Sequence, residues 1–131
     1  MALTFSTTLR NSMADLIDDA VNAGTGAGKI QFAATADTTF STLLAEITCQ
    51  DPAFSAASSG VITLQGTPLS DSSANNTGTV GIFRFVDSDN NEVFRGTCSL
   101  SGDGGDLILS TLSVTSGQTF TISSASITVA L

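Results

Sequence analysis

The spacing of hydrophobic and polar positions changes once along this chain, near residue 24. Before that point, apolar residues recur every three or four positions, which predicts one face of an α-helix at residues 6–23. The apolar positions are Leu9, Met13, Leu16, Ile17, Ala20 and Val21. Ser6, Thr7 or Thr8 can cap the helix, and Gly24 stops it. We expect the helix to lie against a sheet, although the apolar stripe would equally suit a subunit contact.

After residue 28, apolar and polar residues alternate in short segments separated by turn residues, a pattern typical of strands. Phe83 and Phe85, for example, alternate with Arg84. Eight strands are predicted, at residues 29–33, 43–49, 60–64, 78–86, 93–100, 106–112, 118–123 and 125–131. The connections are too short for crossover helices, so the pairing should be antiparallel. The predicted fold is mainly β: an antiparallel sandwich or jelly roll of about eight strands with one N-terminal helix.

Length and composition favour one folded domain, residues 1–131. The chain is 41% hydrophobic but only 12% charged, and it contains 18 Ser and 19 Thr, so we expect Ser, Thr, Asn and Gly to cover much of the outer surface. The formal net charge is −8, which disfavours binding to nucleic acid or to anionic membranes. We therefore expect no nucleic-acid or membrane partner, and we interpret the acidity as an aid to solubility.

The residue types needed for most catalysis are scarce. The chain has no histidine, and its basic residues are Arg10, Lys29, Arg84 and Arg95. A serine hydrolase needs a base, and no Ser-x-x-Lys pair supplies one. We therefore predict that the protein is not an enzyme and has no catalytic, cofactor-binding or metal site. The opening residues lack a basic region followed by an apolar run, so we expect no secretory signal and synthesis in the cytoplasm.

Three acidic or glycine-rich segments resemble ligand motifs only in part. Residues 24–29, GTGAGK, lack the first glycine and the terminal Ser or Thr of a phosphate-binding loop, so we interpret them as a connector between helix and strand. Residues 87–92, DSDNNE, lack the glycine of a calcium loop and are better explained as a hairpin turn. Residues 101–106, SGDGGD, resemble a calcium loop in composition only.

The remaining polar and sulfur-containing residues have structural interpretations. Asp15, Asp18 and Asp19 are assigned to a solvated helix face, because nothing indicates the burial that shifts a carboxyl pKa. Cys49 and Cys98 are expected to be buried, unpaired thiols. The acceptor sequence NNT at residues 75–77 marks an exposed loop.

Several segments in order resemble small virion proteins of tailed bacteriophages, over nearly the whole chain. The segments are MALTFSTTLRN at 1–11, LLAEITC at 43–49, SDSSA at 70–74, GTVGIFRFVDS at 78–88 and the Ser/Thr-rich final strands. The resemblance implies a capsid decoration (cement) protein with a β-sandwich or jelly-roll fold. It implies location on the outer surface of the virion head, where the major capsid protein would be the partner.

The resemblance also implies a homo-oligomer, as a homotrimer or alternatively a dimer, seated over junctions between capsid subunits. Residues 1–12 and the loop 66–78 are the expected gripping elements. The alternatives are a phage tail or head–tail connector protein, which copy number per particle would distinguish, and a carbohydrate-binding adhesion module. The last alternative needs an aromatic ring to stack on the sugar, whereas most of the eight phenylalanines occupy core-like positions.

Overall fold

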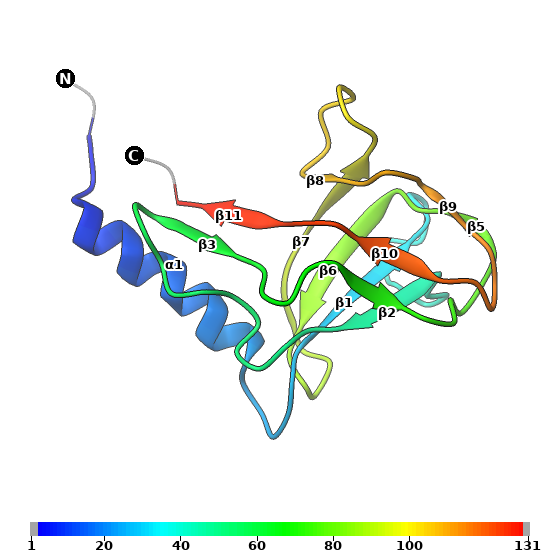
Figure 1. Ribbon diagram of the computed structural model, residues 1–131, viewed down its shortest axis with the longest axis horizontal. Helices are drawn as coiled ribbons and strands as arrows, with labels where there is room; N and C mark the ends of the chain where they lie inside the picture. The colour runs from blue at the N-terminus through cyan, green and yellow to red at the C-terminus, as the bar shows by residue number, and fades with distance from the viewer. Residues whose placement is uncertain (1–2, 130–131) are drawn as a thin grey trace.

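A computed structural model describes residues 3–129, which form one helix and eleven short strands (Figure 1). Helix α1 spans Thr7–Val21, slightly less than the predicted 6–23. The strands are β1 (Lys29–Ala33), β2 (Ala45–Thr48), β3 (Val61–Thr63), β4 (Leu69–Asp71), β5 (Gly78–Thr79), β6 (Ile82–Val86), β7 (Glu92–Ser99), β8 (Leu107–Ile108), β9 (Ser113–Val114), β10 (Phe120–Ile122) and β11 (Ser126–Thr128). The mainly β fold with one N-terminal helix is confirmed.

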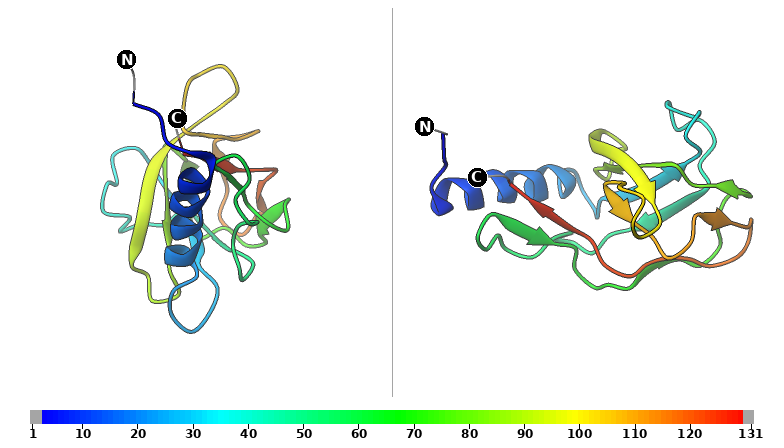
Figure 2. Two further views of the ribbon diagram at one scale, coloured as in Figure 1. Left: turned by 90° about the vertical axis from the view of Figure 1, so that its left-hand side faces the viewer. Right: turned by 90° about the horizontal axis from the view of Figure 1, so that it is seen from above.

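The strands form one five-stranded sheet and three two-stranded ladders. The sheet order is β2–β1–β6–β7–β8, and the ladders are β10–β4, β11–β3 and β5–β9. Phe32 lies opposite Phe83 and Ile30 lies opposite Phe85, so these apolar residues share one face of the sheet. The molecule is elongated: α1 and the β3–β11 ladder lie side by side at one end, and the sheet lies at the other (Figure 2).

One predicted strand, 78–86, is divided between two parts of the fold. β5 pairs with β9, whereas β6 lies in the five-stranded sheet. Between them, the amides of Val80 and Gly81 donate hydrogen bonds to the carbonyls of Leu112 and Ala33 respectively. The break divides the predicted strand by burial as well: β5 has no buried residue, whereas Val80 and the β6 residues Phe83, Phe85 and Val86 are buried.

The pairing at the β7 edge of the sheet differs from the prediction. Of the predicted strand 106–112, only β8 forms, and it runs parallel to β7 rather than antiparallel. The loop 100–106 protrudes from the fold here and returns the chain to run in the same direction as β7 (Figure 1). Of the predicted strand 125–131, β11 is observed, and residues 130–131 lie outside the described part of the chain.

Two strands, β4 and β9, were not predicted from the sequence. Neither β4 nor β9 exceeds three residues, and each contains one apolar side chain beside polar ones, so neither shows a period of two. β4 lies inside the segment 66–78, which the sequence predicts to be a loop. Its partner β10 comes from a distant part of the sequence, so the pairing is decided by tertiary structure.

The sheet face that carries the phenylalanines is the core of the molecule. The rings of Phe85 and Phe94 stack with centroids 4.6 Å apart, and Phe32 meets Phe120 of β10 edge-on at 5.0 Å. Such aromatic pairs add stability beyond the burial of their surface. Cys49 and Cys98 are buried and unpaired, as predicted.

Burial makes both thiols unreactive in the folded protein. It raises the pKa of Cys49 and of Cys98 to about 12, so almost no thiolate exists at pH 8. We expect neither thiol to react with Ellman's reagent at this pH in native buffer, and both to react promptly once guanidinium unfolds the chain. Rapid labelling of either cysteine in the folded state would contradict the described packing.

The polar face of α1 is bound to the segment 53–60 rather than freely solvated. Four side-chain oxygens, spaced along the helix, each accept a hydrogen bond from a backbone amide of that segment. The acceptor–donor pairs are Asn11–Gly60, Asp15–Ala57, Asp18–Phe54 and Asn22–Ala53, at 2.7–2.9 Å. Asp19 is exposed. The interpretation of Asp15 and Asp18 as merely solvated was therefore wrong.

With these hydrogen bonds in place, the side of α1 that is buried differs from the side predicted from its apolar stripe. The buried helix residues are Arg10, Ala14 and Val21. Arg10 donates from Nη2 to the Ser59 carbonyl at 2.6 Å, while its buried Nε has no hydrogen-bond partner among the described atoms. The helix lies along the two-stranded β3–β11 ladder and also contacts β7 of the five-stranded sheet, so the prediction that it lies against a sheet is confirmed, although the buried side of the helix differs from the predicted one.

Candidate interaction surface

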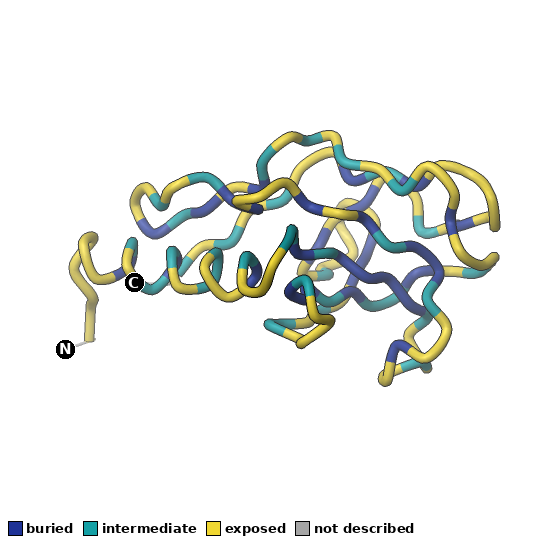
Figure 3. Tube along the Cα trace, turned by 90° about the horizontal axis from the view of Figure 1, so that it is seen from below, coloured by how far each residue is buried: buried dark blue, intermediate teal, exposed yellow. Residues whose placement is uncertain are grey.

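The rotation of α1 leaves an apolar stripe on its outer side. Leu16 is 65% exposed and Leu9 is 47% exposed; Ala20 is exposed and Met13 half-buried on the same side of the helix. Exposed positions recur along the helix in Figure 3. An exposed group of large apolar side chains is typical of an interaction site. We call Leu9, Met13, Leu16 and Ala20 the helix stripe.

The segment before the helix extends the exposed apolar surface. Leu3 is 78% exposed and Phe5 is 39% exposed, and Ser6 caps α1 by accepting a hydrogen bond from the Leu9 amide at 3.1 Å. This segment belongs to the predicted gripping element 1–12. Phe5 is the exposed member of the eight phenylalanines, since the other rings are buried or half-buried.

The other predicted gripping element, 66–78, is held to the body of the protein. β4 pairs with β10, the Ala74 amide donates to the Gln118 carbonyl, and the Asn76 side chain donates to the Leu43 carbonyl at 2.7 Å. A segment fixed at so many points offers a shaped surface rather than a free arm. Residues 1–12 and 66–78 were both predicted to be gripping elements, but only the segment 66–78 is held along its length by the rest of the fold.

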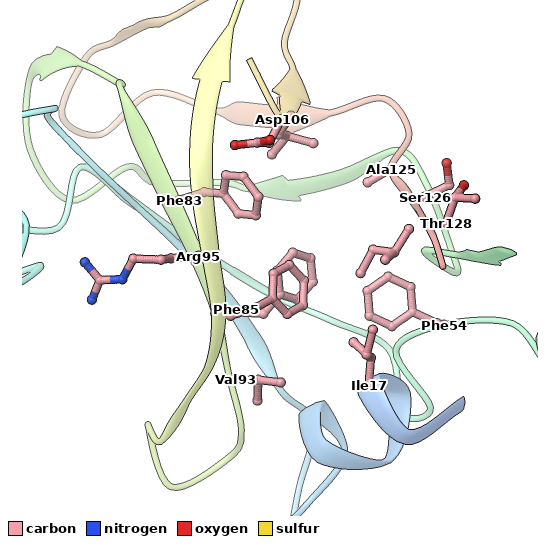
Figure 4. A pocket seen from close by; sticks show the side chains of 13 residues that line it. Ile17, Phe54, Phe83, Phe85, Val93, Arg95, Asp106, Ala125, Ser126 and Thr128 are labelled. Atoms are coloured by element: carbon pink, nitrogen blue, oxygen red, sulfur yellow. The ribbon is translucent and has the colours of Figure 1, made fainter. Parts of the chain in front are cut away.

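An apolar cavity of about 460 Å³ lies where α1 and β11 meet the β6–β7 side of the sheet (Figure 4). The rings of Phe83 and Phe85 face it, and Ile17 of α1 lines it from the helix side. Arg95 borders the cavity but directs its guanidinium away from it in Figure 4. Asp106, Ser126 and Thr128 are polar residues of an otherwise mainly apolar lining.

The opposite face of the sheet carries a row of polar side chains across four strands. Gln31 donates to Glu46 at 2.6 Å, and Arg84 Nε donates to Gln31 at 2.8 Å. Glu92 accepts hydrogen bonds from Arg95 Nη2 at 2.6 Å and Nε at 2.9 Å. This row of hydrogen-bonded polar side chains was not predicted, although Gln31 and Arg84 are polar residues within otherwise apolar strands.

Phe40 covers the two arginines of this row. Its ring centroid lies 4.5 Å from Cζ of Arg84 and 5.2 Å from Cζ of Arg95, so both guanidiniums face an aromatic ring. Arg95 also donates from Nη1 to the Thr38 carbonyl at 2.7 Å. With their charges engaged in this way, the arginines hold the loop 34–42 against the sheet.

The hydrogen bonds from Arg95, supported by Arg84, lower the pKa of Glu92 below its ordinary value of 4.5. A carboxyl whose folded pKa is lowered stabilises the fold above its unfolded pKa, and this contribution is lost as the pH falls through the folded pKa. We expect Glu92→Gln to lower the urea midpoint at pH 7, and the difference from wild type to vanish towards about pH 2. Equal differences at both pH values would contradict this assignment.

The acidic side chains of the two calcium-like segments accept hydrogen bonds from other protein groups. Asp87 accepts from the amides of Asp89 and Asn91 and from the Asn91 side chain, at 2.9–3.0 Å, in the expected hairpin between β6 and β7. Asp106 accepts from the Thr97 amide at 2.9 Å. Hydrogen bonds from Asn91 and Thr97, respectively, lower the pKa of these carboxyls.

Within residues 3–129, no group of three or more His, Cys, Asp or Glu side chains is placed to hold a metal ion. In the same range, no helix has the length and apolar character needed to cross a membrane. No protein-family model matches the chain, and no curated protein or solved structure matches it.

Proposed function

We propose that this protein is a bacteriophage capsid decoration protein that binds the outer surface of the head shell and stabilises contacts between major capsid protein subunits. The resemblance of its ordered segments to small phage virion proteins is the starting point. The observation that carries the proposal is the exposed apolar segment around Leu3 and Phe5, at one end of an acidic, hydroxyl-rich molecule. No catalytic chemistry or cofactor is needed for this role.

Many weak contacts suffice for such a function. A shell presents its subunits in many copies, so a homo-oligomer that engages two or more of them gains strength from simultaneous attachment. Burying Leu3, which is 78% exposed, against a capsid subunit would supply about 1.5–3 kcal/mol, and Phe5, which is 39% exposed, would add a smaller amount. The acidic, hydroxyl-rich remainder keeps the crowded particle surface soluble.

We further propose that the fold is a small β-sandwich. In this description the five-stranded sheet is one layer, and the short ladders form the other. Its support is the contact between Phe32 of the sheet and Phe120 of the β10–β4 ladder across the core. Further support comes from Phe54, whose ring centroid lies 5.5 Å from that of Phe85.

The first experiment counts this chain against the major capsid protein in gradient-purified particles. Decoration predicts a ratio between one to one and one to a few, because the protein would cover the shell. A ratio below roughly one to thirty would replace the proposal with the connector or tail alternative. Complete absence from the particles would refute any virion role.

A second experiment tests the N-terminal segment. The double variant Leu3→Ser/Phe5→Ser should bind undecorated capsids at least about tenfold more weakly, because two apolar side chains no longer leave water on binding. Ile108→Ser is the matched control, since Ile108 is 46% exposed on β8, outside this segment. Equal loss of binding in both variants would refute a specific role for residues 3–5.

A further inference from the structure

The helix stripe has the spacing of a coiled-coil seam. Leu9, Met13, Leu16 and Ala20 are separated by four, three and four residues, which is the alternation of a and d positions in a heptad. The Asp15 and Asp18 hydrogen bonds to segment 53–60 anchor the opposite side of the helix. Leu9, Leu16 and Ala20 of the seam are exposed and Met13 is half-buried, so most of the seam is accessible to a partner.

The seam is complementary to itself when a second helix runs antiparallel. A two-fold axis midway between residues 14 and 15 places Leu9 against Ala20 of the second copy, and Met13 against Leu16 of the second copy. The helix spans Thr7–Val21, so this axis lies close to its centre. Each large residue at the ends meets a small one, whereas a parallel pair would set Ala20 against Ala20 and leave a gap.

The charges beside the seam also permit this arrangement. Ser12 and Asp19 occupy the flanking positions on one side, and the antiparallel register brings Ser12 beside Asp19 of the second copy. A hydroxyl can donate a hydrogen bond to a carboxylate, so the acidic chain avoids opposing two carboxylates there. The antiparallel arrangement also places the opposite ends of the two helix dipoles together.

We propose that α1 is a homodimerisation element, and that two copies of this chain associate through an antiparallel contact of their helix stripes. Of the two assembly states expected from the sequence, this selects the dimer. A 15-residue helix is about 22 Å long, so the contact is small for a protein interface. We expect a dissociation constant of roughly 10–100 µM. The proposal does not depend on capsid binding, since it concerns the purified protein alone.

Sedimentation equilibrium of the full chain from roughly 1 to 500 µM spans the expected constant. The wild type should convert from monomer to dimer, and Leu16→Glu should remain monomeric throughout. Ile108→Glu is the control and should dimerise like the wild type, because Ile108 is an exposed apolar residue on β8. Leu16 is largely exposed, so its variant should keep the circular dichroism spectrum of the folded protein. A wild-type monomer or trimer, or a dimer unaffected by Leu16→Glu, would overturn the proposal.

Disulfide trapping tests the orientation. Met13→Cys and Leu16→Cys chains should form a cross-linked heterodimer when mixed and oxidised with diamide, and much less cross-linked product when oxidised separately. The native cysteines are buried and should not contribute. Efficient cross-linking of each variant with itself would indicate a parallel pair and overturn the proposed register. If dimerisation holds while capsid binding fails, only the decoration proposal falls.

Discussion

Gly28→Ala is expected to lower the free energy of unfolding by about 3 kcal/mol, because there is no room for a side chain at this position. A Cβ at Gly28 would lie 2.5 Å from Val21 Cγ1 and 2.6 Å from the Val21 carbonyl oxygen. On its other side the Val86 carbonyl oxygen would be 2.8 Å away. Two of these atoms belong to the backbone at the end of α1 and in β6, so relieving the clash requires separating the helix from the sheet.

Gly26→Ala is the matched control in the same connector. The nearest heavy atom to a Cβ at Gly26 is Ser88 Cβ, at 3.9 Å, which is ordinary contact. Its effect should be within about 0.5 kcal/mol of zero, because an added methyl group there meets no obstacle. Urea unfolding of both variants, followed by circular dichroism, measures the difference. Similar stabilities for the two variants would contradict the close approach of helix, connector and sheet.

Asp18→Ala should cost about 2 kcal/mol, the second largest effect that we expect. Asp18 Oδ1 accepts hydrogen bonds from the Phe54 amide and from the Asn22 side chain, both at 2.9 Å. Phe54 is buried, so removing the acceptor leaves its amide without a partner in a place that water reaches poorly. An unpaired buried donor carries its full desolvation cost.

Asp19→Ala removes the same charge one residue away and separates this effect from net charge. Asp19 is exposed, so we expect a change within about 0.5 kcal/mol of zero. Asp18→Asn retains an acceptor oxygen and should lose less stability than Asp18→Ala. If Asp18→Ala and Asp19→Ala were equally stable in urea, the hydrogen bond between α1 and segment 53–60 would not contribute to the fold.

Only part of the candidate interaction surface could be predicted from the sequence. The apolar stripe of α1 could be identified from the spacing of its residues, whereas residues 1–12 were expected to bind a partner only because of the resemblance to phage virion proteins. Which side of the helix would be buried could not, because it depends on amides at positions 53–60, about 40 residues away in sequence. A polar stripe that satisfies backbone groups across such a distance looks the same in sequence as one that faces water.

The sequence by itself determined the local features of this protein: the helix, most of the strands, the hairpin at residues 87–92 and the buried thiols. These follow from short-range periodicity, turn residues and burial preference, which act within a few residues. Tertiary structure alone decided the break at Val80 and Gly81, the parallel β7–β8 edge and the pairing of β4 with β10. It also decided the outward rotation of α1. Each of these depends on hydrogen-bond partners distant in sequence, and a local pattern carries no information about which distant group will satisfy a donor.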